Sequence, residues 1–222
     1  MSETLPTRTD DATPAAGDWA PSTTAVVLAG GGSERFGDRA KATANLDGRP
    51  LLARVVAALG AATDAPPIVA VGDRAKQDTV EPVVPEPVHY RYDVAWCDGP
   101  VSGVAGALPA VDTDAVVLCG CDMPLVDSGV VRWLARLLDG ETGAVVPVVD
   151  GVEQPLHAVY DRAALRSYCR WRPADDRLTA LLDSLRVETV TPTEAPAGVP
   201  LAQSVTNVNT RSELAALERA AD

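Results

Sequence analysis

The feature that most constrains the fold is an apolar, β-branched run that breaks directly into three glycines. The stretch reads Ala25-Val-Val-Leu-Ala-Gly30-Gly-Gly-Ser-Glu-Arg35-Phe-Gly-Asp-Arg-Ala-Lys41. Such a run is typical of a buried strand. Glycine lets the backbone approach an anion closely and turn several N–H groups towards it. With Arg35 and Lys41 supplying two cations, the stretch predicts a strand followed by a polyphosphate-binding loop.

Two common phosphate-binding motifs do not match this loop. A Walker loop requires Gly-Lys followed by Ser or Thr, whereas Gly37 is followed by Asp38 and Arg39. A dinucleotide-binding fingerprint requires a third glycine where Arg35 stands. The loop is therefore predicted to bind a nucleotide in another way, with Arg35 and Lys41 acting on the phosphates.

The order of elements predicts an α/β fold with a doubly wound, mostly parallel sheet. Strands are predicted from Ala25 and at Ile68–Val71, Val88–Tyr92 and Ala115–Cys119, and helices after Pro50, around Arg74–Thr79, after Gly103 and after Asp127 or Ser128. Strands that alternate with helices in this way favour a parallel sheet covered on both faces.

The second half of the chain has a different pattern. Ala144–Val149, the turn pair Asp150-Gly151 and Leu156–Tyr160 predict a hairpin. Helices near Arg162–Trp171 and Leu178–Leu185, a strand near Val187–Val190 and a capping box at Thr210–Glu213 follow. We expect a disordered tail at 1–21 and one domain at 22–222, with a nucleotide-binding half at about 22–140 and an acceptor half at about 141–222.

Charge and residue usage exclude several classes of function. The formal charge of −12 argues against nucleic acid as a partner. No apolar run is long enough to span a membrane and no signal peptide is recognisable, so a cytoplasmic location without membrane attachment is expected. The four cysteines include no Cys-x-x-Cys pair, which argues against a zinc centre. Cys119, Cys121 and His157 are interpreted as packed residues.

A second group of polar residues follows later strands. Asp122 comes directly after the Ala115–Cys119 strand, and ligands of parallel sheets collect at the carboxyl ends of the strands. Mg²⁺ prefers oxygen ligands, often a carboxylate with substrate phosphates. Asn207 and Asn209 would share one side of an extended segment and could support the same metal. Asp122, Asn207 and Asn209 are therefore the candidate magnesium ligands.

A third segment is predicted to bind the base of the nucleotide. The Gly99-Pro100-x-x-Gly103 turn could bring backbone close to a flat base. Asp93, just beyond the third strand, could accept hydrogen bonds from N1–H and the 2-amino group of guanine, which cytosine and adenine do not offer. Asp93, Gly99 and Gly103 are the candidate base-binding residues.

Together these motifs resemble the MobA-like molybdenum cofactor guanylyltransferases. Leu28-Ala-Gly-Gly-x-Ser-x-Arg35-x-Gly37 with Lys41 resembles the family's nucleotide loop, Gly99–Gly103 its Gly-Pro segment, Cys121-Asp-Met-Pro124 its magnesium motif, and Asn207–Thr210 its Asn-x-Asn-Thr segment. The resemblance implies a Rossmann-like, three-layer nucleotidyltransferase fold. It implies nucleotide contacts from Leu28, Ala29, Gly30, Gly31, Gly32, Ser33, Lys41, Asp93 and Asp122, and Mg²⁺ on Asp122.

The resemblance also implies the reaction, in which GMP passes from GTP to molybdopterin and pyrophosphate leaves. Arg35, Lys41 and Asp122 with Mg²⁺ would then neutralise charge as two anions meet. Molybdoenzyme apoproteins or their chaperones are candidate partners. The family's spacing before Gly99 differs by one residue, and Val71 stands where some members have asparagine. Cytidylyl transfer to molybdopterin, guanylyl transfer to a cobamide precursor or phospholactate, and non-catalytic GTP binding stay open as alternatives.

Overall fold

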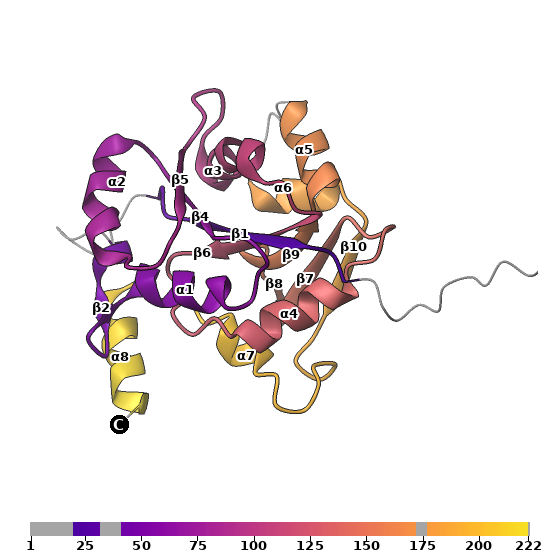
Figure 1. The fold of residues 1–222 in the computed structure, drawn as a ribbon. Coiled ribbons are helices and arrows are strands. Elements are labelled where there is room, and N and C mark those ends of the chain that lie inside the picture. The colour runs from indigo at the N-terminus through magenta and orange to yellow at the C-terminus, as the bar shows by residue number, and fades with distance from the viewer. Residues whose placement is uncertain (1–19, 32–40, 172–176, 222) are drawn as a thin grey trace, which may run out of the picture.

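The computed structural model describes residues 20–31, 41–171 and 177–221 of the 222-residue chain. Its main sheet is built from β1 (Thr23–Leu28), β4 (Ile68–Val71), β5 (His89–Tyr92), β6 (Ala115–Gly120), β7 (Ala144–Val149), β9 (His157–Asp161) and β10 (Val187–Val190). The strands lie in the order β10-β7-β9-β6-β1-β4-β5 (Figure 1). Along this path β9 runs antiparallel to β6 and β7, and the other neighbours are parallel. The predicted mostly parallel sheet is confirmed.

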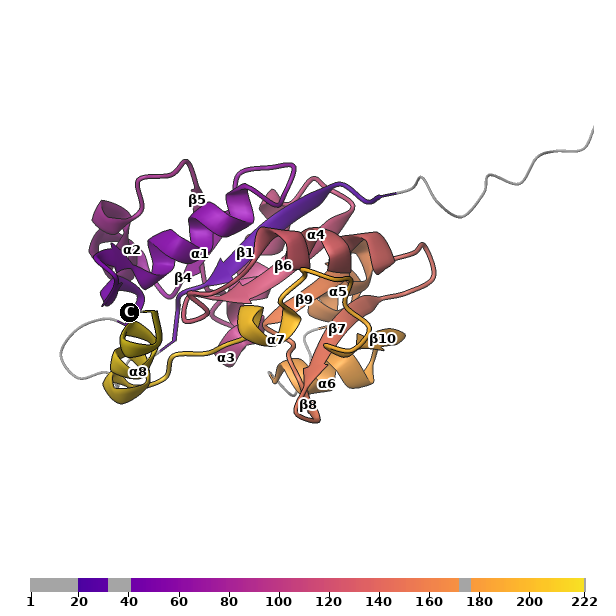
Figure 2. The same cartoon turned by 90° about the horizontal axis from the view of Figure 1, so that it is seen from below.

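Helices cover both faces of this sheet (Figures 1 and 2). One face carries α1 (Leu51–Gly60), α2 (Arg74–Val80), α4 (Ser128–Leu137) and α7 (Leu201–Ser204), and the other carries α3 (Gly99–Ala107), α5 (Arg162–Arg170) and α6 (Leu178–Asp183). Successive residues of β6 therefore enter opposite cores, with Val117 packed on the α1 side and Val116 on the α3 side. This double burial explains why the central strands are apolar without alternation. Among the described helices, none is both long and apolar enough to cross a bilayer.

A small group of elements packs together at the end of the molecule away from β10 (Figure 2). Here α8 (Arg211–Ala221) lies beside the hairpin of β2 (Asn45–Leu46) and β3 (Arg49–Pro50), and Leu214 and Leu217 pack on a small apolar cluster. The N–H of Thr210 donates to the Glu213 carboxylate at 3.0 Å, and the N–H of Glu213 donates to the Thr210 hydroxyl at 3.2 Å. The predicted capping box is confirmed.

The predicted hairpin is present, but its return arm is split. Asp150 and Gly151 have φ of 51° and 76°, as a tight hairpin turn requires. The two residues of β8 (Val152–Glu153) then pair with β7. The N–H of Gln154 still donates to the Pro147 carbonyl of β7 at 2.8 Å, and residues 155 and 156 then leave the ladder. β9 resumes next to β7 while pairing along its length with β6. The return arm thus consists of β8 at the hairpin and β9, which lies between β7 and β6 in the sheet.

The start of the domain differs slightly from the prediction. Residues 1–19 of the predicted tail lie outside the described residues. Pro21, which we assigned to that tail, is buried. The next residue, Ser22, donates its hydroxyl to the Asp114 carboxylate at 2.7 Å. This contact fixes the residues just before β1 beside the start of β6.

His157 is a packed strand residue, as predicted. It is 2% exposed at the start of β9, and its Nε2 lies 3.0 Å from the Ser204 hydroxyl of α7. The Ser204 hydroxyl also accepts the N–H of Asp127 at 2.9 Å, and the Asp127 carboxylate caps α4. Burial lowers the pKa of His157 to about 4, which keeps the ring neutral at ordinary pH. This buried link joins β9, α4 and α7.

We expect the protein to lose stability as the pH falls from about 6.5 to about 4. An unfolded histidine binds its proton near pH 6.5, whereas folded His157 resists protonation down to a pKa of about 4. Stability from the neutral ring is thus complete above pH 6.5 and lost by pH 4, at a cost of roughly 3 kcal/mol. Urea unfolding of wild type and His157→Gln at pH 7 and pH 5 measures it. The exposed His89, changed to Gln, is the control, and an equal pH dependence in both variants would contradict the assignment.

Candidate active site

The candidate site lies where the order of the sheet changes direction. The chain runs from β1 to β4 and β5 on one side, and then β6 returns to the other side of β1. In doubly wound sheets the ligand crevice opens at such a point, beyond the carboxyl ends of the two strands. The ends are tied together here, because the N–H of Cys121 donates to the carbonyl of Leu28 at 3.2 Å. Ala29, Gly30 and Gly31 after β1 therefore lie on the same edge as Asp122 after β6.

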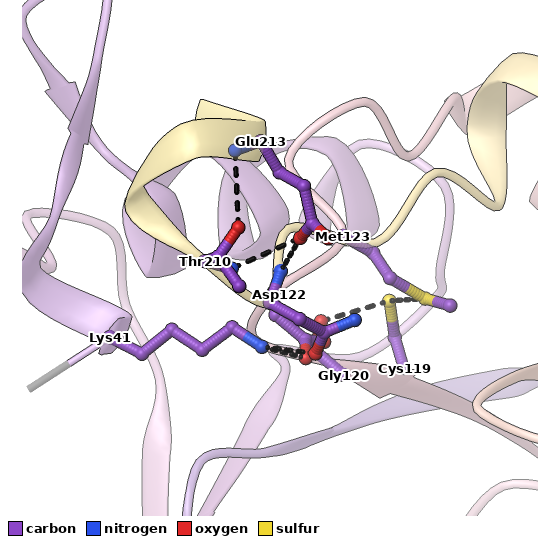
Figure 3. Close-up of polar contacts among 8 residues, drawn as sticks. Lys41, Cys119, Gly120, Asp122, Met123, Thr210 and Glu213 are labelled. Atoms are coloured by element: carbon purple, nitrogen blue, oxygen red, sulfur yellow. Dashed lines mark hydrogen bonds and ion pairs between the residues drawn. The ribbon is translucent and has the colours of Figure 1, made fainter. Parts of the chain in front are cut away.

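Asp122 is paired with the lysine that follows the glycine loop. The Lys41 ammonium donates to the Asp122 carboxylate at 2.5 Å and to the side-chain oxygen of Asn209 at 2.8 Å. The two side chains of the ion pair are 15% and 21% exposed, so both are largely shielded from water. Figure 3 shows Lys41 extending to Asp122, with Thr210 and Glu213 at the start of the last helix close by. The Lys41 ammonium thus contacts two residues that are distant in the sequence: Asp122 lies 81 positions away and Asn209 lies 168 positions away.

The C-terminal asparagines reach this edge through a backbone contact. The N–H of Val208 donates to the carbonyl of Asp122 at 2.9 Å, and the Val208 side chain is fully buried. Asn207 and Asn209, on either side of it, are both exposed and so face away from that core. The predicted pair is thus exposed on either side of a buried residue. Of the two, Asn209 contacts Lys41.

The oxygens around Lys41 suit a hard cation. A carboxylate and an amide oxygen already converge on one positive charge, and both are ligand types that Mg²⁺ accepts. Within the described residues, no group of three or more His, Cys, Asp or Glu could hold a metal ion. A magnesium ion here would therefore combine Asp122 and asparagine oxygens with ligands from substrate and water.

Asp93 lies beneath the glycine loop on the same edge. A Cβ on Gly30 would stand 2.6 Å from one Asp93 carboxylate oxygen, and a Cβ on Gly103 would stand 3.3 Å from the other. A side chain at Gly30 would therefore displace the Asp93 carboxylate from this position. Oδ1 of Asp93 is buried and has no hydrogen-bond partner among the described residues. Burial raises the pKa of Asp93, opposed by the Ser102 hydroxyl and the Lys76 charge. An unpartnered buried oxygen of this kind is ready to accept a donor from a ligand.

The Gly99–Gly103 segment forms the first turns of α3. Gly99 has a φ of 65°, which favours glycine, and Ser102 donates its hydroxyl to the Gly99 carbonyl at 2.9 Å. The N–H of Val94 donates to the Ser102 carbonyl at 3.3 Å, which holds this turn against the chain leaving β5. The turn and Asp93 are therefore neighbours, as base recognition would need.

The structure adds a residue that the sequence analysis did not assign. Lys76 of α2 donates its ammonium to the carbonyl of Gly30 and to that of Gly31, the latter at 2.8 Å. The sequence did contain one signal for a role of this residue, the scarcity of lysine, because Lys41 and Lys76 are the only lysines in the sequence. Both lie on the candidate edge, each beside a predicted aspartate.

Three predicted residues are not placed. Gly32, Ser33 and Arg35 lie outside the described residues, so their expected roles stay predictions. Cys119 and Cys121 behave as packed thiols: burial raises the pKa of Cys121 to about 12 and that of Cys119 well above its usual range. Neither thiol is ionised at neutral pH, which agrees with their interpretation as packed residues.

Comparisons with known proteins bear on the family to which the chain belongs. Residues 25–190 match the model of the MobA-like NTP transferase domain. A probable molybdenum cofactor guanylyltransferase of Haloferax mediterranei is 35% identical over 196 residues, which cover 86% of this chain and 91% of that protein. A protein of the same description from Bacillus cereus is 29% identical, with 85% and 92% covered.

A solved structure agrees at the level of the fold. It is the molybdopterin-guanine dinucleotide biosynthesis protein A of Archaeoglobus fulgidus, with a TM-score of 0.73 and 21% identity. The match covers 89% of this chain and 98% of that one. At this identity the likeness shows the fold alone.

Proposed function

Because the chain belongs to the MobA-like NTP transferase family, and is thus a nucleotidyltransferase, we propose that it transfers GMP from GTP to molybdopterin. The products are the molybdopterin guanine dinucleotide cofactor and pyrophosphate. The observation that carries this proposal is the convergence of Lys41, Asp122 and Asn209 beside the glycine loop at the switch point of the sheet. Molybdoenzyme apoproteins or their chaperones are proposed to receive the product.

The proposed chemistry needs charge neutralisation more than proton transfer. The attacking phosphate of the pterin is already ionised, and it must approach the α-phosphorus of another anion in line with the departing pyrophosphate. Asp122 with Asn207 and Asn209 would hold Mg²⁺, which when bound offsets the negative charge of the triphosphate. Lys41 lies next to Asp122 and adds a second positive charge at the same place. Arg35 is proposed to act with it.

The nucleotide is proposed to lie along the edge from β6 to β5. Leu28, Ala29, the glycines and Ser33 would contact the phosphates and ribose through backbone groups. Gly99, Gly103 and Asp93 would enclose the base. The unpartnered Oδ1 of Asp93 supports guanine in particular, because an ionised carboxylate matches two adjacent donors.

The acceptor is proposed to bind on the other side of Asp122. Since β7 and β6 both run antiparallel to β9, their carboxyl ends lie on the same edge. The hairpin of β7 and β8 therefore projects on the edge that carries Asp122, and Val152 at its tip is 59% exposed. This arrangement supports the division into a nucleotide half at about 22–140 and an acceptor half at about 141–222.

We expect wild type to release pyrophosphate from GTP and molybdopterin, and to use CTP and ATP poorly. Asp93→Asn is expected to reduce the preference for GTP over CTP by about 10- to 100-fold, because the amide cannot accept both guanine hydrogen bonds. Asp98→Asn, in the same loop but exposed, is the matched control and keeps the preference. Pyrophosphate release with each nucleotide measures it. Preference of wild type for CTP would favour cytidylyl transfer, and unchanged discrimination in Asp93→Asn would refute the role of Asp93.

A further inference from the structure

We propose that Lys76 is a positioning residue that sets the glycine loop for phosphate binding and keeps Asp93 ready for the base. The inference rests on the proposed function of the site. It starts from the two contacts of the Lys76 ammonium, with the carbonyls of Gly30 and Gly31. No motif in the sequence links these residues, since Lys76 stands 46 positions after Gly30 on a different element.

The first step concerns the direction of the peptide groups. A peptide is planar, and in its trans form the N–H points opposite to the preceding carbonyl. The described residues contain no cis peptide. When the Gly30 carbonyl turns towards Lys76, the N–H of Gly31 therefore turns away from it. A glycine has no side chain to fix this orientation and could adopt several others. Because the Lys76 ammonium donates to two successive carbonyls, it selects one of these peptide orientations.

The second step concerns the helix that carries the lysine. Asp73 caps α2 by accepting the N–H of Lys76 at 2.8 Å, which fixes the backbone of Lys76. Gly72 lies below, and a Cβ there would stand 3.7 Å from the lysine side chain and from the Gly30 carbonyl. Lys76 is thus anchored at its backbone and half-buried, with its stem passing near Gly72. Its ammonium reaches the loop from a fixed base rather than from a free surface.

The third step links the loop to Asp93. The same Gly30 that receives Lys76 stands over the Asp93 carboxylate. The groups that act on the pKa of Asp93 are the Ser102 hydroxyl of α3 and the charge of Lys76, which lower it, and the charge of Asp73, which raises it against the background of burial. One lysine therefore serves both ends of the nucleotide: it orients backbone for the phosphates and favours the ionised carboxylate for the base.

The test uses inorganic tripolyphosphate as a probe of the phosphate site alone and GTP as the complete ligand, each with Mg²⁺. Calorimetry on Lys76→Met is expected to show about tenfold weaker binding of tripolyphosphate, as expected for loss of charged hydrogen bonds. Arg74→Met is the matched control, since it removes the same charge from an exposed position of α2. Its binding is expected to change by less than about twofold.

A pH series separates this role from a merely structural one. GTP binding by wild type should fall at acid pH as Asp93 takes up a proton. In Lys76→Met the fall should begin at higher pH, because the charge that lowers the pKa of Asp93 is gone. Tripolyphosphate has no base, so its own binding should not show this displacement. Lys76→Arg, which keeps the charge, should restore the wild-type acid limb.

Each outcome decides the inference. Equal binding of both probes by wild type and Lys76→Met, or equal losses in Lys76→Met and Arg74→Met, would overturn the role of Lys76 while leaving the proposed function intact. Failure of wild type to bind GTP would instead remove the proposed function and the inference with it. Should Lys76→Met prove unstable, Lys76→Gln takes its place in the same comparison, because its amide also lacks the charge.

Discussion

Asp122→Ala is expected to lower the rate of Mg²⁺-dependent pyrophosphate release by about 10³-fold or more while the protein stays folded. Loss of a single group that stabilises developing charge already costs about 10²–10³ in rate. Asp122 would lose more, because the proposed magnesium ion and the Lys41 ammonium both depend on its carboxylate. The fold should persist, since the contact with Val208 uses the backbone carbonyl of Asp122, which alanine keeps.

The control for this variant lies at the opposite end of the same strand. Asp112 precedes β6 at its amino end and is exposed, whereas Asp122 follows β6 at its carboxyl end. Asp112→Ala removes the same charge and should leave turnover within about twofold of wild type. Rates are measured across magnesium concentrations, with circular dichroism for folding. Unchanged turnover of Asp122→Ala at limiting magnesium would exclude Asp122 as the metal ligand.

Lys41→Met is expected to reduce kcat by about 10²–10³-fold, with a smaller effect on GTP binding. A cation aimed at the triphosphate contributes most when charge develops on the departing pyrophosphate, so its loss appears mainly in kcat. Arg132→Met, on the outer side of α4, removes an equal charge away from the site and serves as the control. A rise in the Michaelis constant alone would mean that Lys41 binds substrate and transition state equally.

A second measurement on Lys41→Met does not depend on activity. In the free protein the Lys41 ammonium occupies the oxygens of Asp122 and Asn209. A divalent cation must compete with it for those atoms. Electron paramagnetic resonance with Mn²⁺ should therefore show binding to Lys41→Met at least as tight as to wild type. Weaker Mn²⁺ binding would contradict the arrangement, because it would mean that the oxygens no longer converge without the lysine.

The central strands could be predicted because burial on both faces of the sheet requires apolar residues at successive positions. Ala115–Cys119 is apolar and buried at every position, and so is Ile68–Val71. The turn at Asp150-Gly151 was visible for a similar local reason, since few residue pairs adopt two successive positive φ angles. The split of the return arm was not visible. The arm pairs with β7 through β8 and then with both β7 and β6 through β9, and pairing partners are not encoded locally.

The residues of the candidate site likewise divide into those that could be predicted from the sequence and those that could not. Asp122 and the glycine loop could be assigned from their position after apolar strands, because parallel strands bring their carboxyl ends to one edge. Lys76 could not, since nothing near it in the sequence indicates that its helix faces Gly30. The buried contact between His157 and Ser204 is equally remote, with 47 positions between them. What the sequence does not show is which distant elements pack against one another, because only the tertiary structure determines it.

The scarcity of lysine gives this protein a built-in chemical reporter. Apart from the terminal amino group, its amines are those of Lys41 and Lys76, and both lie on the edge that is proposed to bind GTP. An acylating reagent that reacts with amines would therefore label the rest of the chain hardly at all. Mass spectrometry of the two labelled peptides would follow ligand binding in the unmodified sequence, with Lys41 reporting on the metal end and Lys76 on the glycine loop.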